Sequence, residues 1–366
     1  MTPPFRADQV GSLLRPLELR AAHEKFLEGK LELAALRALQ DRAIREVIAF
    51  QESLGLQAIT DGEFRRASFA SDFIEKLDGA GTTGSLQIKT ESGKFAPRAY
   101  HVTGKLRHAR PIEVEGFKFV KANTTRTPKQ TIPSPTMLLR GGRNAVSGEA
   151  YPDLEQFYAD IAKVYREELR QLGDAGCRYV QLDDTNYAFL CDDKLREVFR
   201  EWGYDPDAMP ERFAKLINAV LAGRPAGMIA GIHLCRGNSA GKWAAQGAYE
   251  PVADVLFNQL DVDAYFLEYD DARSGGFEPL RFFPKGSRKK VVLGLVSTKK
   301  PEVEKPDDLK KRIEEAARFI PLDNLCLSPQ CGFASTFRGN PVTEDVQRKK
   351  LELVVRTATE VWGSPR

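Results

Sequence analysis

The stretch MIAGIHLCRGN, residues 228–238, decides the fold because it displays how a strand of this chain is built. It begins with an apolar run and turns polar only toward its end. That pattern is typical of a parallel strand buried on both faces. His233 and Cys235 are two residues apart, so on a strand their side chains point to the same face. The stretch therefore predicts a buried parallel strand with a histidine and a cysteine side by side at its carboxyl end.

Seven other short apolar segments recur along the chain, and most of them also end in polar residues. They cover residues 4–14, 56–63, 130–138, 177–184, 263–270, 289–297 and 324–333. Helical periodicity is clear in 36–54 and 154–172, and further helices are predicted at 209–222, 250–260, 306–319 and 343–362. Eight strands alternating with helices predict an α/β fold, a (β/α)8 TIM barrel closed by a C-terminal helix. A doubly wound open sheet is the alternative, although no GxGxxG motif follows a strand.

Residues 81–123 interrupt this alternation. The segment is rich in glycine, threonine and lysine, and its second half alternates between polar and apolar residues. We predict a β-hairpin insertion that leaves the barrel after the second strand. No linker or internal repeat divides the chain, so residues 1–366 are expected to form a single TIM-barrel catalytic domain.

The composition narrows the classes of function. The 366 residues are 42% hydrophobic and 29% charged, with a formal net charge of +3. This balance is ordinary for a soluble globular protein and does not favour nucleic-acid or membrane binding. The first ten residues lack the apolar core of a signal peptide, and no stretch approaches the ~18 apolar residues of a membrane span. Five cysteines without a short framework spacing predict reduced thiols and a cytoplasmic protein.

Polar residues gather at the predicted strand ends, which form the active rim of a barrel. Taken alone, His233 and Cys235 are more typical of a buried core histidine beside a buried thiol than of a metal site. A further thiol, Cys331, and a carboxylate, Glu268, end two other strands. Together the four residues make a His/Cys/Cys/Glu set that suits tetrahedral zinc. The remaining cysteines lie in apolar packing segments and are interpreted as structural.

At these residues the chain resembles the cobalamin-independent methionine synthase family. The resemblance rests on the His-x-Cys of IHLCRGN, the glutamate of DVDAYFLEYD and the cysteine of SPQCGF. FRADQVGSLLRP, DGEFRR and VQLDD match further family segments. The match covers nearly the whole length of the family's short, single-barrel branch and the C-terminal catalytic half of its long, two-barrel enzymes.

The resemblance implies a zinc-dependent methyltransferase that moves a methyl group to the thiol of homocysteine and makes methionine. The implied zinc ligands are His233, Cys235, Glu268 and Cys331. Ser12, with the backbone of Val10 and Gly11, would hold the carboxylate of the amino acid. Glu63 and Asp183 would hold its ammonium group, although both could instead pair with arginines such as Arg65 and Arg66.

The donor half of the site departs from the family. Gln9 stands where the short branch often has a histidine. The segment IPSPTMLLRGG has no aromatic residue, whereas the long enzymes carry a tryptophan there on which folate stacks. The N-terminal barrel of the long enzymes is also missing. The donor is therefore methyltetrahydrofolate, a methylated corrinoid carrier protein or a small methylated compound. Tyr187 and Trp243 follow strand ends and are candidates for the donor pocket, with ordinary packed aromatics as the alternative.

Two other functions compete with methionine synthesis. A related enzyme could alkylate another thiol, as in the opening of an epoxide by coenzyme M. Such an enzyme would not need the amino-acid pocket formed by Val10–Ser12, Glu63 and Asp183. A non-catalytic barrel that binds zinc or thiols is the second alternative. Structural zinc sites usually draw their ligands from short loops, whereas these ligands come from three separated strand ends.

Overall fold

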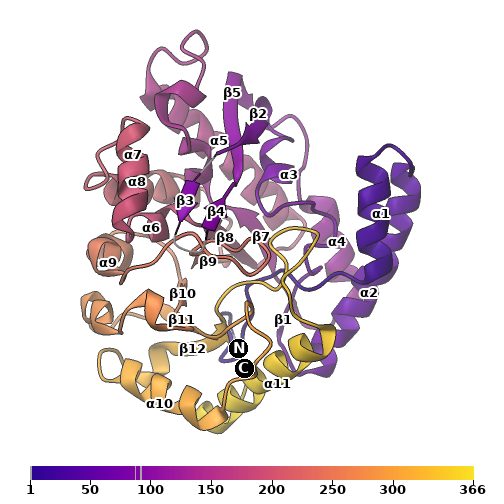
Figure 1. Cartoon of the computed structure of the whole chain (residues 1–366), viewed down its shortest axis with the longest axis vertical. Coiled ribbons are helices and arrows are strands. Elements are labelled where there is room, and N and C mark those ends of the chain that lie inside the picture. Colours follow the sequence, from indigo (N-terminus) through magenta and orange to yellow (C-terminus); the bar gives the residue numbers. More distant parts are fainter. Residues whose placement is uncertain (1, 87, 91–92) are drawn as a thin grey trace.

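Six parallel strands form the central sheet. The computed structural model describes residues 2–86, 88–90 and 93–366. In spatial order the sheet reads β7, β8, β9, β10, β11 and β12, the same as the order in the chain (Figure 1). The bounds are β7 Gln130–Pro133, β8 Tyr179–Asp184, β9 Ile229–Leu234, β10 Ala264–Glu268, β11 Lys290–Val296 and β12 Leu325–Pro329. Each strand lies inside a predicted one, so six of the eight strand predictions are confirmed.

The sheet is buried on both faces, as the apolar runs predicted. Its register brings the functional strand ends together: Asp183 of β8 lies opposite His233 of β9, and Leu267 of β10 lies opposite Leu234 of β9. Because neighbouring parallel strands lie about 4.8 Å apart, the residues at their carboxyl ends share one rim.

The first two predicted strands are shorter than expected. β1 (Ala58–Ile59) pairs in parallel with β6 (Thr127–Pro128), which leads into β7. Segment 4–14 is not a strand, and it joins the sheet through one bridge from Ala7 to Leu327. The Asp8 carboxylate accepts hydrogen bonds from the backbone N–H groups of Phe5 and Gln9, which a ladder would otherwise use. In the described residues no ladder joins segment 4–14 to β1, so the closed barrel stays a prediction.

Helices surround the sheet (Figure 1). All six predicted helices are confirmed, each to within a few residues. In α5 the apolar stripe of Phe157, Ile161, Tyr165 and Leu169 is buried. The helices are α1 Leu17–Leu27, α2 Leu33–Ser53, α3 Ser71–Ile74, α4 Val114–Asn123, α5 Leu154–Asp174, α6 Asn186–Phe189, α7 Asp193–Glu201, α8 Met209–Leu221, α9 Glu250–Asn258, α10 Pro306–Ala317 and α11 Glu344–Trp362.

The segment predicted as a hairpin is partly helical. β2 (Asp78–Ser85) pairs with β5 (Arg98–Arg107), and β3 (Ile88–Thr90) pairs with β4 (Gly93–Phe95), both antiparallel. The predicted bounds 81–123 are wrong, because α4 occupies the last ten of those residues. Val114, Phe117 and Val120 are spaced to bury one face of a helix. Three residues of the predicted hairpin, 87, 91 and 92, lie outside the described part of the chain.

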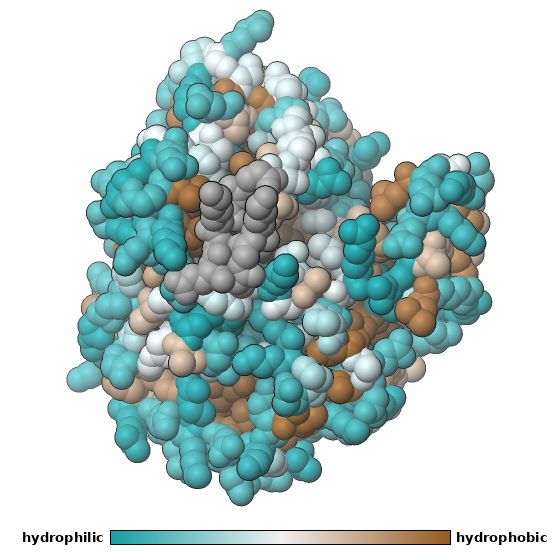
Figure 2. Space-filling model, in the orientation of Figure 1, coloured by the Kyte–Doolittle hydropathy of each residue, from teal (hydrophilic) through white to brown (hydrophobic). Residues whose placement is uncertain are grey.

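The surface is mostly hydrophilic in the view of Figure 2, with apolar patches on the helical pair α1–α2. Leu17, Leu27 and Leu33 of this pair are more than half exposed. The pair stands beside the body of the molecule, and the surface is hollowed between them. Within the described residues, no helix has both the length and the apolar character needed to cross a bilayer.

Candidate metal centre and adjoining pocket

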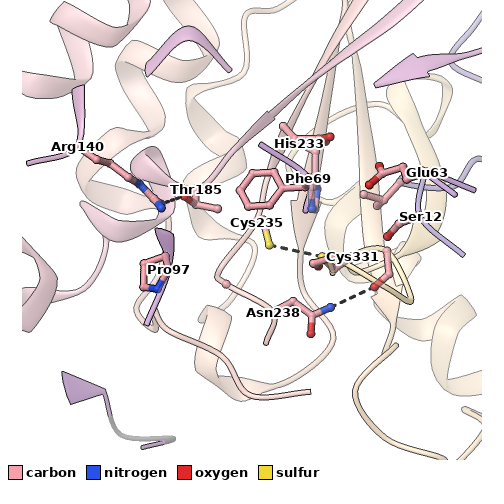
Figure 3. Close-up of a pocket in the computed structure, with 15 residues that line it drawn as sticks. Ser12, Glu63, Phe69, Pro97, Arg140, Thr185, His233, Cys235, Asn238 and Cys331 are labelled. Carbon is pink, nitrogen blue, oxygen red and sulfur yellow. Dashed lines mark hydrogen bonds between the residues drawn. The ribbon is translucent and has the colours of Figure 1, made fainter. Parts of the chain in front are cut away.

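The four predicted metal ligands lie together at the rim. His233 and Cys235 come from the end of β9, Glu268 is the last residue of β10, and Cys331 follows β12 by two residues. One ligand atom from each residue lies within 4.8 Å of the other three, and all four residues are buried. The two sulfur atoms are 3.4 Å apart (Figure 3).

This arrangement fits a zinc ion by two observations. Tetrahedral zinc with Zn–S bonds of about 2.3 Å holds two sulfurs roughly 3.8 Å apart, close to the spacing found here. Within the described residues, both ring nitrogens of His233 are buried without a hydrogen-bond partner. A buried polar atom normally has a partner, and a metal would be one for this imidazole.

The two thiols of the set have pKa values shifted in opposite directions. The pKa of Cys331 lies well below its ordinary value, because Cys235 donates a hydrogen bond to its sulfur and because His233 and Lys299 are close. The pKa of Cys235 is raised, since it holds the shared proton and is buried. The pair therefore carries one negative charge, which a divalent cation would stabilise.

Positive groups surround the carboxylate of Glu268. The backbone N–H of Arg236 donates to Oε1 at 2.9 Å, Nη2 of Arg273 lies 3.4 Å from Oε2, and Nζ of Lys299 lies 3.7 Å from it. The Arg236 guanidinium is fully buried and stacks over the ring of Tyr249 at 4.3 Å. Glu268 therefore has two cations, Arg273 and Lys299, within 4.0 Å of its Oε2.

Two buried carboxylates lie beside this centre. Burial raises the pKa of Glu63 to about 7, and the charge of Asp183 adds to the shift against the pull of Arg66. Burial raises the pKa of Asp183 to about 6. Arg66 reaches Glu63 only at 3.8 Å, because it also contacts Glu113 and Thr131. The alternative was that arginines pair with both carboxylates. Among the described residues, Arg66 pairs with Glu63 at 3.8 Å, and no arginine forms an ion pair with Asp183.

The turn predicted to hold a substrate carboxylate lies next to these acids. Val10 and Ser12 line the same cavity as Glu63, Asp183, His233, Cys235 and Cys331. Gly11 does not line it in the described residues, but its backbone has φ +142°, and a Cβ there would meet Glu63 at 2.9 Å. A Cβ on Gly332 would meet Ser12 Oγ at 1.9 Å, so glycine allows the two loops to approach.

The two aromatics predicted for the donor pocket lie elsewhere. Tyr187 is a core residue: its hydroxyl donates to the Pro210 carbonyl at 3.1 Å and its ring packs against Phe213. Trp243 is partly buried beneath the Arg273 guanidinium at 5.5 Å. Neither lines this cavity among the described residues, so a donor-pocket role for them stays a prediction.

Four further residues line the cavity that the sequence did not predict as part of the site: Phe69, Pro97, Arg140 and Thr185. Phe69, Pro97, Asn238 and Ser335 also line a groove of about 700 Å³ beside α1 and α2, so the cavity opens into this groove. Arg140 follows the 3-10 helix Pro135–Leu139, which comes after β7. Its place just beyond the predicted strand 130–138 was the signal that could have found it.

Comparisons with known proteins agree on a single family. A model described as the catalytic domain of cobalamin-independent synthase matches residues 5–359. The uncharacterized protein YxjH of Bacillus subtilis (strain 168) is 45% identical over 361 residues, which cover 98% of this chain and 95% of that protein. The methionine synthase of Pyrococcus horikoshii is 27% identical over 97% of this chain and 94% of its own. A candidate vitamin-B12-independent methionine synthase of Listeria monocytogenes has a solved structure with TM-score 0.80, 36% identity and 100% coverage of both chains.

Proposed function

This chain belongs to the cobalamin-independent synthase family, and from that membership we propose that it moves a methyl group to the thiol of homocysteine to form methionine. One observation carries the proposal: the His/Cys/Cys/Glu set and the acids Glu63 and Asp183 line or border one cavity. A thiol that binds metal and an ammonium group that binds carboxylates are the two ends of homocysteine.

The four ligands would hold zinc, which removes the proton from a coordinated thiol at neutral pH. A free thiol has a pKa near ~8.5 and is mostly protonated at pH 7. The substrate sulfur, as thiolate, forms the new S–CH3 bond. The bond from the methyl carbon to the donor breaks, and its electron pair stays with the donor.

Glu63 and Asp183 orient the amino acid. Two carboxylates in one buried place leave a negative charge that an ammonium group neutralises. Their partners Thr131 and Gln181 hold the two acids at 3.0 and 2.7 Å. Ser12 and the backbone of Val10 to Ser12 would bind the substrate carboxylate next to them.

Glu268 is the ligand that would yield its position to the substrate sulfur, because it is the only oxygen ligand of the four. Arg273 and Lys299 lie 3.4 and 3.7 Å from its Oε2 and would keep the displaced carboxylate paired. Metal-edge spectroscopy before and after homocysteine addition tests this exchange: one sulfur more and one oxygen fewer is the expected result, and an unchanged ligand count contradicts it.

We also propose that residues 1–366 form a single domain with a closed TIM barrel. Buried residues from separate strands pack into one cluster, and Phe5 of the N-terminal segment joins it. The cluster consists of Phe5, Ala58, Tyr179, Ala264, Phe266, Val292 and Cys326. A layer to which many strands contribute is what a barrel interior requires.

The deciding experiment couples metal analysis with a methyl-transfer assay. Purified protein should contain one zinc per chain and methylate homocysteine with methyltetrahydrofolate, methylcobalamin or a small methyl donor. Cys331→Ser should lose both the zinc and the activity, because a serine hydroxyl is a poor ligand. Cys177→Ser is the matched control, since that buried thiol donates to the Tyr179 carbonyl and lies outside the set. A Cys331→Ser protein that retains zinc and activity would contradict the proposal.

A further inference from the structure

Arg140 is a buried cation in the wall of the cavity. Its side chain is 2% exposed and yet lines the space next to Cys235. Nε donates to Asn186 Oδ1 at 3.0 Å, and Nη2 donates to Thr185 Oγ1. Both acceptors are uncharged, so they orient the guanidinium without neutralising it.

No carboxylate pairs with Arg140 among the described residues, whereas the buried cations Arg66, Lys129 and Lys350 each reach a carboxylate within 4.0 Å. Asp184 acts on Arg140 only from a distance, because its carboxylate oxygens accept from Thr136 Oγ1 and the Tyr187 N–H. Burial lowers the pKa of Arg140, but a guanidinium stays protonated in proteins. A buried charge without a partner is costly and marks a place where an anion would be stabilised.

The guanidinium still has a donor to offer. Its Nη1 makes no hydrogen bond within the described part of the chain, and it is not among the enclosed atoms without a partner. In Figure 3, Arg140 and Thr185 lie on one side, Ser12 and Glu63 lie on the other, and Cys235 and Cys331 lie between them. Glu63, which fits the amino acid, and Arg140, which fits an anion, therefore lie on opposite sides of the two sulfurs in this view.

The groove that leads into the cavity is positively charged, like Arg140. The groove that shares Phe69 and Pro97 with the cavity is lined by five arginine and lysine residues and by two acids. The basic residues are Arg37, Arg65, Lys76, Arg98 and Arg338. A groove with excess positive charge raises the local concentration of anionic ligands.

We propose that Arg140 binds an anionic group of the methyl donor, a carboxylate or a phosphate, and that the enzyme therefore selects anionic donors over uncharged ones. The proposal rests on the proposed methyl transfer and names the class of its donor. Pairing with Arg140 would place the anionic group on the side of the sulfurs away from Ser12 and Glu63 (Figure 3).

Anion binding tests the site independently of any methyl transfer. Acetate and inorganic phosphate are titrated by calorimetry into the zinc-loaded full chain and into Arg140→Gln, Arg140→Lys and Arg143→Gln. Arg143 is the matched control, because it lies three residues on and outside the cavity. We expect Arg140→Gln to weaken binding of at least one anion about tenfold or more, Arg140→Lys to weaken it less, and Arg143→Gln to leave it unchanged. Equal affinities in all four proteins would overturn the proposal.

Matched donors then identify the class. 5-Methyltetrahydrofolate is compared with a 5-methyltetrahydropterin that lacks the whole p-aminobenzoylglutamate tail and therefore carries no carboxylate. Methylcobalamin is compared with methylcobinamide, which lacks the phosphate-linked nucleotide. For the pair used by the wild type, Arg140→Gln should raise the KM of the anionic member about tenfold and leave its partner unchanged. Equal losses for both members would refute the assignment. If no donor methylates homocysteine, the proposed function fails, and the anion titration alone decides the role of Arg140.

Discussion

Glu63 is a carboxyl group whose position disfavours its own charge. The residue is 4% exposed and shares its surroundings with Asp183, so its pKa rises to about 7. A carboxyl with a raised pKa binds its proton more tightly in the folded than in the unfolded state. Ionisation of Glu63 therefore lowers the free energy of unfolding. The full loss is present above pH 7, and almost none is present below the unfolded pKa near 4.5.

Glu63→Gln should consequently make the protein more stable and less able to bind homocysteine. At pH 8 we expect a gain on the order of 3 kcal/mol from the removed charge, most of which is gone by pH 5. Homocysteine binding should weaken at pH 8, because the ammonium group loses one of its two carboxylates, and should change less at pH 5, where the Glu63 carboxyl is already protonated.

Thermal melts at pH 5 and pH 8, with calorimetric titration of homocysteine, measure the two effects of this substitution. Glu115→Gln on the exposed face of α4 is the control and should change neither. A Glu63→Gln protein that melts lower than the wild type at pH 8 would show that Glu63 is held by its neighbours rather than strained.

At the scale of elements, strand ends and helix starts set the rim. The two-residue side-chain period of β9 places His233 and Cys235 together, and the neighbouring strands add Asp183 and Glu268. The loops after the strands are held by caps. Asp192 begins α7 by accepting from the N–H groups of Lys194 and Leu195, and its other oxygen accepts from the N–H of Gln246 at 3.0 Å.

Asp192→Ala should therefore weaken both a helix start and a loop of the rim. The lost cap costs about 1–2 kcal/mol, and the Gln246 N–H loses its acceptor as well. Asp153→Ala, which removes the single exposed cap bond of α5, should cost about 0.5–1 kcal/mol. Urea unfolding measures the loss of stability in both variants. Hydrogen exchange at the Gln246 N–H should speed up only in Asp192→Ala. Equal losses of unfolding free energy in the two variants would mean that Asp192 only caps α7 and does not hold the loop.

At the scale of the whole molecule, one buried ion pair ties the N-terminal segment to the sheet. Lys129 follows β6 and reaches Asp8 at 3.0 Å, with both side chains 0% exposed. The Tyr179 hydroxyl of β8 donates to the same carboxylate at 2.8 Å, and the ammonium group lies over the ring of Phe266. Segment 4–14, which lacks a full ladder, is thus held by polar contacts inside the sheet.

Lys129→Met should destabilise the protein by about 3–5 kcal/mol, because it leaves the Asp8 charge buried and unpaired. Asp8→Leu combined with Lys129→Met should cost less than the single change, since no charge remains inside. Lys30→Met removes an exposed pair with Glu28 and should cost about 0–1 kcal/mol. Urea unfolding measures the stability of all three variants. A double variant less stable than Lys129→Met would contradict the explanation by an unpaired buried charge.

Local patterns made most of the fold predictable. Apolar runs of strand length gave six strands correctly, and 3.6-residue periodicity gave six helices. The errors occur where tertiary contacts override the local pattern. The alternation in residues 114–123 resembled a strand, but Val114, Phe117 and Val120 bury together as a helix against the body. Segment 4–14 resembled a strand, but the Asp8 side chain uses the backbone donors.

By itself the sequence determined which residues could act as ligands and that they stand at strand ends, because residue type and periodicity are properties of the chain. Only the tertiary structure decided which of them meet. Cys235 and Cys331 are 96 residues apart in the chain and touch because parallel strands end at one rim. The same packing buried Arg140 without a partner carboxylate among the described residues, and it placed Tyr187 in the core. Charge, burial and distance arise only when distant segments pack together, and no local pattern records them.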